Sequence, residues 1–304
     1  MEEEMMMKDF SIEGLQKIGQ GLTASVYRIN EEQIIKVYVP EYGLDRILKE
    51  KDVTRQSFIS GVPTMMTFGT VCVGDSYGTI FEAFNYETLQ ECYQKQHANR
   101  DSLVDEYVDF VKQISAVQVN DELRDMLPSM LERLKNVFNK ERYRLSDEES
   151  QIYEELISRI EHTDTFVHGD CHMGNLMYGP HQKLYAIDLG VCGYGSKLFV
   201  LCSIALSYSV GAKSLPGEQL YEVTGLSREE CKELWHSFLC KYYGINGDEI
   251  IPYERSLYMY ACMISSLYGI ETGKIPEEVF RNVMVRGVVD TYKDGILPMS
   301  KLLS

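Results

Sequence analysis

Basic residues are scarce in this sequence: 30 lysines and arginines stand against 46 aspartates and glutamates, and the formal net charge is −16 over 304 residues. A surface with that charge repels nucleic acid and anionic membranes, so we expect neither as a partner. The same charge favours a cationic partner, although solubility alone is a sufficient reason for it. The length fits one unit of two lobes or two modest domains.

Long apolar runs are also missing. The longest, Leu198 to Ala212, contains three serines and is too short to span a bilayer, so it is predicted to be a buried helix. The first residues, Met1 to Glu4, lack the basic region of a secretory signal. The eight cysteines include no C-x-x-C pair and no Cys/His cluster with zinc-ligand spacing. They predict reduced thiols in a cytoplasmic protein and no zinc site.

The hydrophobic pattern changes near Phe84. Before it, short runs rich in Val, Ile and Tyr predict strands, with one helix, at residues 15–19, 25–29, 33–39, 44–60 (the helix), 67–73 and 79–84. After it, helical spacing dominates, with a β-like patch at 166–188 and predicted helices at 101–119, 151–160, 198–212, 228–243, 253–270 and 276–291. The sequence therefore predicts an α+β fold with a small β-rich lobe and a larger helical lobe.

The segment His168 to Tyr178 reads HGDCHMGNLMY and holds residues suited to phosphoryl transfer. That reaction needs a carboxylate to orient the attacking hydroxyl group and oxygen ligands to hold Mg²⁺ on the phosphates. Asp170 is the candidate for the first role, with a turn or cap residue as the structural alternative. Asn175 and the later Asp188 are the candidate metal ligands, because Mg²⁺ prefers few protein oxygens together with phosphates and water.

Gly19 and Gly21 lie between two predicted strands, in the stretch IGQGLTASVY. Glycine-rich loops of kinases cover the phosphates of ATP with backbone N–H groups, and glycine permits the close approach. A two-glycine hairpin turn explains the pattern equally well. A Rossmann fingerprint fits less well, because it opens a helix and Ser25 to Ile29 is predicted to be a strand.

Lys36 is the single charge in the predicted strand IIKVY. In kinases a strand lysine contacts the α- and β-phosphates and pairs with a helix glutamate, and a buried lysine needs such a partner. Glu50, in the helix that follows, is the predicted partner, and Glu41 is the alternative. A solvated lysine on an edge strand is the structural alternative for Lys36.

The strand that ends at Phe84 is predicted to run into a hinge between the lobes. Adenine would meet backbone C=O and N–H groups there, near Glu82 and Phe84, although an ordinary core strand explains the segment too. Glycine loop, lysine, glutamate, hinge, catalytic loop and metal ligand thus follow the order found in kinases. Agreement among individually weak motifs strengthens the kinase hypothesis.

The sequence resembles the aminoglycoside phosphotransferase and choline kinase superfamily, and within it uncharacterised bacterial phosphotransferases. The resemblance rests on HGDCHMGN followed by IDLG and covers about the first 200 residues. Cys171 and Met173 stand where the family has Leu and Pro, and Ala24 replaces the third loop glycine. The resemblance implies a bilobal protein-kinase-like fold and a structural role for His168; His172 is assigned no chemistry, and a solvent-facing histidine would explain it. It also implies a nucleotide-binding lobe at 1–84 and a catalytic, acceptor-binding lobe at 85–304.

A small-molecule acceptor is favoured over a protein. Protein kinases carry H-R-D-L-x-x-x-N and a later A-P-E segment, whereas Gly169 replaces that arginine and a predicted helix begins at Leu198. The tyrosines near the C-terminus and the single Trp235 predict either a helix core or a cation cage. We predict a Mg²⁺-dependent kinase that uses ATP or GTP and phosphorylates an aminoglycoside, amino alcohol or sugar. A non-catalytic nucleotide-binding regulator and a protein kinase are the alternatives.

Overall fold

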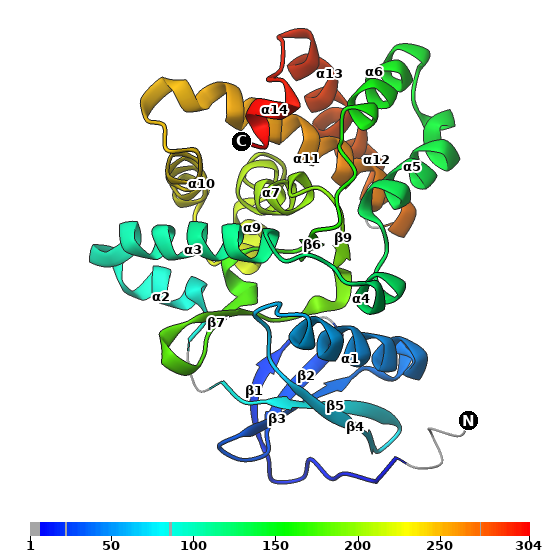
Figure 1. Ribbon diagram of the computed structural model, residues 1–304, viewed down its shortest axis with the longest axis vertical. Coiled ribbons are helices and arrows are strands. Elements are labelled where there is room, and N and C mark those ends of the chain that lie inside the picture. The colour runs from blue at the N-terminus through cyan, green and yellow to red at the C-terminus, as the bar shows by residue number, and fades with distance from the viewer. Residues whose placement is uncertain (1–6, 22, 85–86, 274) are drawn as a thin grey trace. The chain divides into compact units, whose positions relative to one another are not determined.

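The computed structural model describes residues 7–21, 23–84, 87–273 and 275–304, which divide into two compact units (Figure 1). The first unit comprises the chain up to Glu87, Asn120–Leu127 and Met177–Gly190. The second unit comprises Thr88–Val119, Pro128–Leu176 and Val191–Ser304. The acidic start of the sequence and residues 85–86, where the predicted hinge ends, lie outside the described residues.

A five-stranded antiparallel sheet forms the centre of the first unit (Figure 1). Its order is β1-β2-β3-β5-β4, and the strands are β1 (Gln16–Gln20), β2 (Ala24–Arg28), β3 (Gln33–Tyr38), β4 (Thr67–Val73) and β5 (Ser76–Glu82). Their β-branched and aromatic residues favour strands because these side chains pack well on a pleated surface. The register places Lys36 of β3 opposite Val26 on one side and Thr79 on the other. Lys36 therefore lies on a central strand, which excludes the edge-strand alternative.

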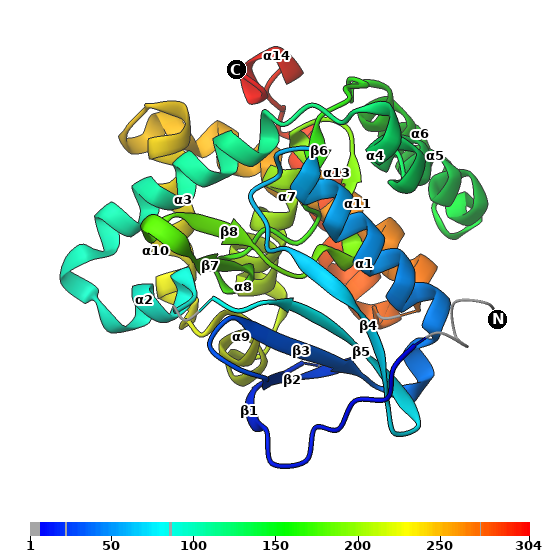
Figure 2. The same cartoon turned by 60° about the horizontal axis from the view of Figure 1, so that its bottom comes forward.

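Helix α1 (Leu44–Ile59) follows β3 and packs against β4 and β5 (Figure 2). Its buried face recurs at the three- and four-residue intervals of an amphipathic helix and consists of Ile47, Glu50, Val53, Thr54 and Ser57. Gly43 precedes the helix with φ +82° and Gly61 follows it with φ +86°, a region that glycine enters without strain. Because Glu50 is a charged residue on a buried face, it needs partners inside the first unit.

Two short elements complete the first unit. Helix α4 (Asp121–Met126) packs against α1, and strands β7 (Leu176–Tyr178) and β8 (Leu184–Ala186) form a hairpin. The hairpin is anchored to the chain between α1 and β4: Thr64 Oγ1 donates to the carbonyl of Ala186 at 2.8 Å, and the Ala186 N–H donates to the Pro63 carbonyl at 2.7 Å. This anchor fixes the segment that leads to Asp188.

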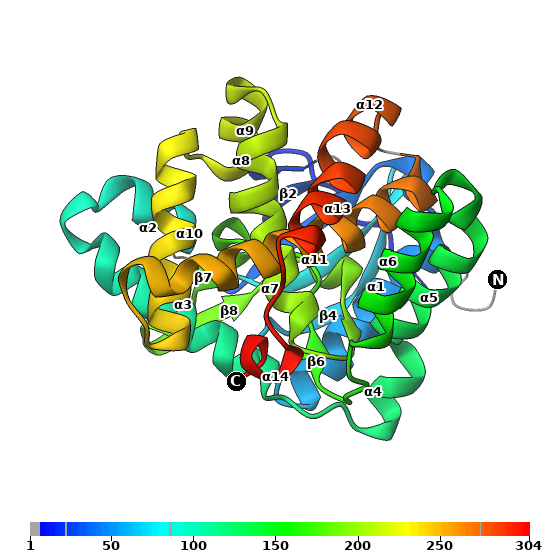
Figure 3. The same ribbon diagram turned by 90° about the horizontal axis from the view of Figure 1, so that it is seen from above.

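Helices make up most of the second unit (Figure 3). All eight side chains of α7 (Leu198–Ala205) are buried, as expected for a helix that is apolar all round. The chain continues from α7 through a π-helical turn, Leu206–Val210, into α8 (Gly211–Ser214). Helix α11 (Ile251–Thr272) packs against α7, and its other contacts include α5 and α13.

The remaining elements of the second unit are helical except for a short strand pair. They are α2 (Leu89–Lys95), α3 (Arg100–Ser115), α5 (Met130–Glu141), α6 (Asp147–Ser158), β6 (Phe166–Val167), β9 (Gly193–Tyr194), α9 (Gly217–Thr224), α10 (Arg228–Tyr243), α12 (Glu277–Val279), α13 (Arg286–Lys293) and α14 (Met299–Leu302). Among the residues that the structure describes, we find no helix with both the length and the apolar character needed to cross a membrane.

The α+β fold class is confirmed, with a small antiparallel sheet and a larger helical part. The helices predicted at 228–243 and 253–270 correspond to α10 and α11. Helix α5 is missing from the predicted elements, although its buried positions Leu131, Leu134, Val137 and Phe138 follow helical spacing. The division of roles between residues 1–84 and 85–304 remains a prediction.

Candidate active site

The glycine-rich turn connects β1 to β2. The Gly21 N–H donates to the Ala24 carbonyl at 2.8 Å, and Leu22 lies outside the described residues. Neither Gly19 nor Gly21 has a φ in the left-handed region, and a Cβ added to either would meet its nearest neighbours at 3.5 Å or more. The hairpin itself therefore does not require glycine at these positions, which weakens the turn-only interpretation. The Rossmann alternative is wrong, because that fingerprint leads from a strand into a helix, whereas the turn after β1 leads into the antiparallel strand β2.

Lys36 lies between two carboxylates. Its Nζ is 2.8 Å from Glu50 Oε1 and 3.2 Å from Asp188 Oδ1. Burial opposes the charge of the ammonium group, but the two carboxylates outweigh that effect, so the pKa of Lys36 is raised. The side chain of Glu50 is 5% exposed and that of Asp188 is 57% exposed. Glu50, and not the exposed Glu41, is thus the helix glutamate at Lys36.

Two tyrosines complete the surroundings of Glu50. Tyr38 donates its hydroxyl to Oε1 at 3.0 Å, and Tyr42 donates to Oε2 at 2.9 Å. Their rings stack with centroids 4.9 Å apart. Burial and the Glu50 charge raise the pKa of both phenols, that of Tyr42 to about 12. Together with Lys36, three donors satisfy this buried carboxylate, as a buried charge requires.

Replacing Tyr42 by Phe is expected to lower the unfolding free energy by about 1 kcal/mol at neutral pH, because a hydrogen bond to Glu50 is lost. The raised pKa adds a pH dependence. Between pH 10, the ordinary phenol value, and about 12 the folded protein keeps the Tyr42 proton while the unfolded chain releases it, so stability falls as pH rises through this window. Urea denaturation across this range measures both effects.

Tyr143→Phe is the matched control, since that side chain is 77% exposed. The control should leave stability unchanged within about 0.5 kcal/mol. If Tyr42→Phe has the same stability as wild type at neutral pH and the same alkaline decline, the bond to Glu50 contributes nothing.

Asp188 adopts an unusual backbone conformation. Its φ is +60°, a left-handed value that is uncommon for residues other than glycine but better tolerated by Asp and Asn. Such strain, of order 1–3 kcal/mol, persists only where the surroundings impose it, and it concentrates at functional sites. The anchor at Ala186 supplies that constraint two residues earlier. Gly190 lies close by: a Cβ there would be 3.6 Å from both Asp188 Oδ1 and Glu50 Oε2.

The predicted hinge residues lie at the end of β5. The Glu82 N–H donates to the Met66 carbonyl at 2.9 Å, and the Ala83 N–H donates to the Glu32 carbonyl at 2.8 Å. Phe84 is 7% exposed, and its ring packs against that of Tyr185 at 4.8 Å between centroids. The Phe84 side chain thus belongs to the core, so any contact that Phe84 makes with a base would use its backbone.

Asp170 and Asn175 meet on one loop of the second unit. Asn175 Nδ2 donates to the Asp170 carbonyl at 2.9 Å and to Asp170 Oδ2 at 3.1 Å. His168 is buried, and its Nδ1 accepts the Asp170 N–H at 3.2 Å. His168 therefore braces the loop, as the resemblance implies. The His172 side chain is 17% exposed, and its Nδ1 accepts the Gly174 N–H at 3.1 Å.

Three buried side chains that the sequence pattern does not single out also hold this loop. Tyr107 of α3 donates to the Cys171 carbonyl, Ser203 of α7 accepts the Cys171 N–H at 3.2 Å, and Tyr208 of the π-helical turn accepts the Met173 N–H at 2.9 Å. Burial raises the pKa of both phenols, so they remain neutral partners. The geometry of this loop is thus set by α3, α7 and the π-helical turn, all distant from it in sequence.

Gly169 is required by its surroundings. Its φ is +81°, and an added Cβ would lie 2.3 Å from the Val191 carbonyl oxygen. Gly43 has nearly the same φ, +82°, with nothing within 4 Å. Both alanine variants should therefore pay a similar backbone cost, and Gly169→Ala should lose about 1–3 kcal/mol more from the clash. Urea denaturation of the two variants measures the difference; equal losses would mean that the loop relaxes freely.

The candidate metal ligands have suitable chemistry for Mg²⁺. Asp188 is exposed and uses Oδ1 for Lys36, which leaves Oδ2. Asn175 uses Nδ2 for Asp170, which leaves its amide oxygen. Hard oxygen donors, few in number, suit an ion whose other ligands are phosphates and water. Within the described ranges, no group of three or more His, Cys, Asp or Glu side chains is placed so that it could hold a metal ion by itself.

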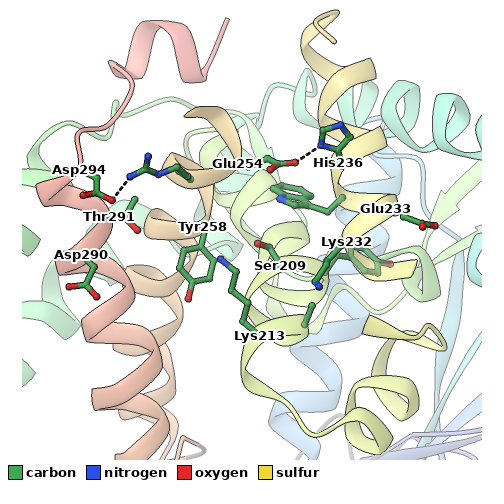
Figure 4. A pocket seen from close by; sticks show the side chains of 14 residues that line it. Ser209, Lys213, Lys232, Glu233, His236, Glu254, Tyr258, Asp290, Thr291 and Asp294 are labelled. Carbon is green, nitrogen blue, oxygen red and sulfur yellow. Dashed lines mark hydrogen bonds and ion pairs between the residues drawn. The ribbon is translucent and has the colours of Figure 1, made fainter. Parts of the chain in front are cut away.

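The second unit also contains a pocket of about 600 Å³ (Figure 4). Its lining comes from the π-helical turn, α8, α10, α11 and α13 and includes Tyr208, Lys213, Trp235, Tyr258 and Asp294. Because the Tyr208 hydroxyl binds the loop that carries Asp170 and Asn175, one wall of the pocket is connected directly to that loop.

The aromatic residues near the C-terminus were predicted to form either a helix core or a cation cage. Tyr242, Tyr260 and Trp235 are buried core residues. Tyr258 does receive a cation on its ring, but the cation is the protein's own Lys213, whose Nζ lies 3.6 Å from the ring centroid.

Comparison with solved structures shows the same fold in small-molecule kinases. Plasmodium vivax ethanolamine kinase matches with a TM-score of 0.53 and 16% identity over 94% of this chain and 83% of that one. A thermostable mutant of aminoglycoside phosphotransferase APH(4)-Ia, in complex with ADP and hygromycin B, matches with a TM-score of 0.61 and 9% identity over 93% of this chain and 94% of that one. The GDP and kanamycin complex of APH(2'')-IIIa matches with a TM-score of 0.54 and 11% identity over 95% of this chain and 96% of that one. These identities establish the fold alone.

Sequence comparison extends this result to the family. No curated protein sequence matches the chain significantly. The profile of the phosphotransferase enzyme family, however, matches residues 14–199, which is more than half of the chain and includes both the Lys36 region and the Asp170 loop. The resemblance to the aminoglycoside phosphotransferase and choline kinase superfamily is thereby confirmed, and the chain belongs to the phosphotransferase enzyme family.

Proposed function

We propose that this protein is a small-molecule kinase that transfers the γ-phosphoryl group of ATP or GTP to a hydroxyl group. The observation that carries the proposal is the contact of Lys36 with both Glu50 and Asp188, in a chain whose family-matching segment also holds Asp170 and Asn175 on one braced loop. These are the groups that phosphoryl transfer needs: a phosphate-binding lysine, metal ligands and a carboxylate for the nucleophile.

In this proposal the first unit binds the nucleotide. Gly19 and Gly21 let the backbone of the turn come close to the phosphates, which is a reason for glycine that the turn itself does not supply. Lys36 contacts the α- and β-phosphates, and Glu50 holds its ammonium group in place. The backbone near Glu82 and Phe84 receives the base. Similar folds with ADP and with GDP are the reason for retaining both nucleotides.

Asp188 and Asn175 are the proposed ligands of Mg²⁺. When bound, the ion neutralises the charge that develops on the phosphates. Lys36 and Asp188 already form a contact, so the phosphate-binding cation and a metal ligand are held together by the fold of the first unit. The strained backbone at Asp188 is consistent with a position kept for its chemistry.

Asp170 is the proposed catalytic carboxylate. Its Oδ2 is held by Asn175, and its side chain is 49% exposed, so it can accept a hydrogen bond from a substrate hydroxyl. It would orient that hydroxyl and take its proton as the phosphoryl group is transferred. The acceptor would occupy the pocket behind Tyr208, which could hold a molecule the size of an aminoglycoside ring, an amino alcohol or a sugar.

The test is consumption of Mg-ATP and Mg-GTP by the purified protein across a panel of hydroxyl compounds, with product phosphate located by mass spectrometry. Turnover of a small molecule supports the proposal. Nucleotide binding without turnover on any small molecule would favour the non-catalytic regulator, and phosphorylation of proteins alone would favour the protein kinase.

A further inference from the structure

The charged residues that line the pocket are almost all paired. Ion pairs join Arg255 to Asp294 at 2.6 Å, Lys232 to Glu229 at 2.8 Å and Arg286 to Asp290 at 3.3 Å, and His236 shares a hydrogen bond of 2.9 Å with Glu254. Two charged lining side chains form neither an ion pair nor a hydrogen bond with any described residue, Lys213 and Glu233. Figure 4 shows the Lys213 side chain extending to the Tyr258 ring, whereas Glu233 lies on α10, away from that ring. Lys213 is therefore the unpaired cation of the pocket lining.

Lys213 is held in a defined position. Its ammonium group lies 3.6 Å from the centroid of the Tyr258 ring, close enough for a cation–π interaction. Helix α13 supports that ring: a Cβ on Gly287 would lie 3.1 Å from Tyr258, so glycine makes room for it. Burial lowers the pKa of Lys213, although the charge of Glu254 acts in the opposite direction. The ring fixes the ammonium group but supplies no acceptor oxygen to it.

Trp235 adds a second observation, a buried donor without an acceptor. The residue lines the pocket and is 4% exposed. Its indole Nε1 is buried and has no hydrogen-bond partner in the part of the chain that the structure describes. Buried polar groups in native proteins normally have a partner, and an indole N–H can only donate. Lys213 and Trp235 thus both offer hydrogens and both call for acceptor oxygens.

We infer that this pocket binds an organic anion, a polyhydroxy carboxylate or phosphate ester, through Lys213. As the acceptor of the proposed kinase reaction, this ligand would carry its anionic group at Lys213 and a free hydroxyl toward the Asp170 loop, so the inference rests on the proposed function. It differs from the cationic acceptor that the net charge of −16 favours, because Lys213 has no ion-pair partner among the described residues, whereas the lining cations Lys232 and Arg255 have one each.

The binding experiment uses the fluorescence of Trp235, the single tryptophan of the chain, as a local reporter. The ligands are D-gluconate, D-glucitol and D-glucamine, which share one carbon chain and end in a carboxylate, a hydroxymethyl and an aminomethyl group. D-glucitol 6-phosphate tests the phosphate ester as the source of the anion. Gluconate or glucitol 6-phosphate should bind about 10–100-fold tighter than glucitol, as expected for a charge-assisted hydrogen bond, and glucamine should bind most weakly.

Lys213→Met removes the charge and keeps the length of the side chain, so the preference for the anion over glucitol should disappear. Lys213→Arg should restore most of it. Lys232→Met is the matched control, because this pocket lysine already pairs with Glu229, and it should keep the wild-type preference. Circular dichroism and melting temperatures establish that each variant folds.

Equal binding of all four compounds to the wild type, tighter binding of glucamine, or no binding of either anion at the limit of solubility would overturn the inference. So would an anion preference that survives Lys213→Met. Turnover is measured separately on the same proteins. Anion binding through Lys213 without turnover of any small molecule in the panel would leave anion binding standing and reject the proposed function, whereas phosphorylation of cationic or neutral acceptors alone would do the reverse.

Discussion

Asp170→Asn should lose about 10²–10⁴-fold in turnover, the usual contribution of a general base, while its affinity for ATP stays near that of the wild type. Asparagine keeps the shape of the side chain, and its amide oxygen can still accept the hydrogen bond that Asn175 Nδ2 now gives to Asp170 Oδ2 at 3.1 Å. The loop should therefore keep its geometry and lose only the base. Steady-state phosphorylation and calorimetric ATP binding measure the two quantities.

The control for this variant is Asp109→Asn, an exposed aspartate of α3 that has no place in the proposed mechanism and should retain full turnover. Wild-type turnover in Asp170→Asn would reject the mechanism. A parallel loss of ATP affinity would show instead that Asp170 holds the nucleotide.

Asp188→Asn is the second substitution with a large expected effect, a loss of about 10²-fold or more in turnover. Several kcal/mol of charge stabilisation depend on the metal ion, and each 1.36 kcal/mol changes the rate tenfold. Asparagine tolerates the left-handed φ of +60° at this position, so the fold should survive. The variant removes one of the two negative charges that Lys36 contacts.

The thermal shift caused by nucleotide separates this metal effect from a general loss of activity. Ligand binding to the native state raises its stability by mass action. In the wild type the shift with ATP should grow when Mg²⁺ is added, and in Asp188→Asn this Mg²⁺-dependent part should be mostly lost. Identical Mg²⁺ titrations of the two proteins would remove Asp188 from the metal site.

The contact between Lys36 and Glu50 was accessible from sequence because it depends on local patterns. A charge in the middle of an apolar strand needs a partner, and the following helix offers Glu50 on its buried face. Tyr38 and Tyr42, which bind the same carboxylate, were accessible in principle. A buried carboxylate has more than one lone pair to satisfy, and both residues lie within the segment between Lys36 and Glu50.

The support of the Asp170 loop could not be read in this way. Tyr107 precedes Cys171 by 64 residues and Tyr208 follows Met173 by 35. Helical periodicity indicates that these tyrosines face a core, but it does not say which loop their hydroxyl groups meet. The pocket depends on still more distant pairings, since Lys213 and Tyr258 come from separate helices. Such contacts follow from the packing of the whole unit.

The π-helical turn Leu206–Val210 has a consequence for how related chains diverge. A π turn holds one residue more than an α turn, so deletion of a single residue there would restore a regular α-helical turn while the helix on either side keeps its faces. Tyr208, whose hydroxyl group accepts the Met173 N–H, is the middle residue of this turn, so such a deletion would shift the position from which that bond is made. A one-residue gap at this point in an alignment should therefore mark a change in how the loop with Asp170 and Asn175 is held, even between chains whose HGD and IDLG segments are identical.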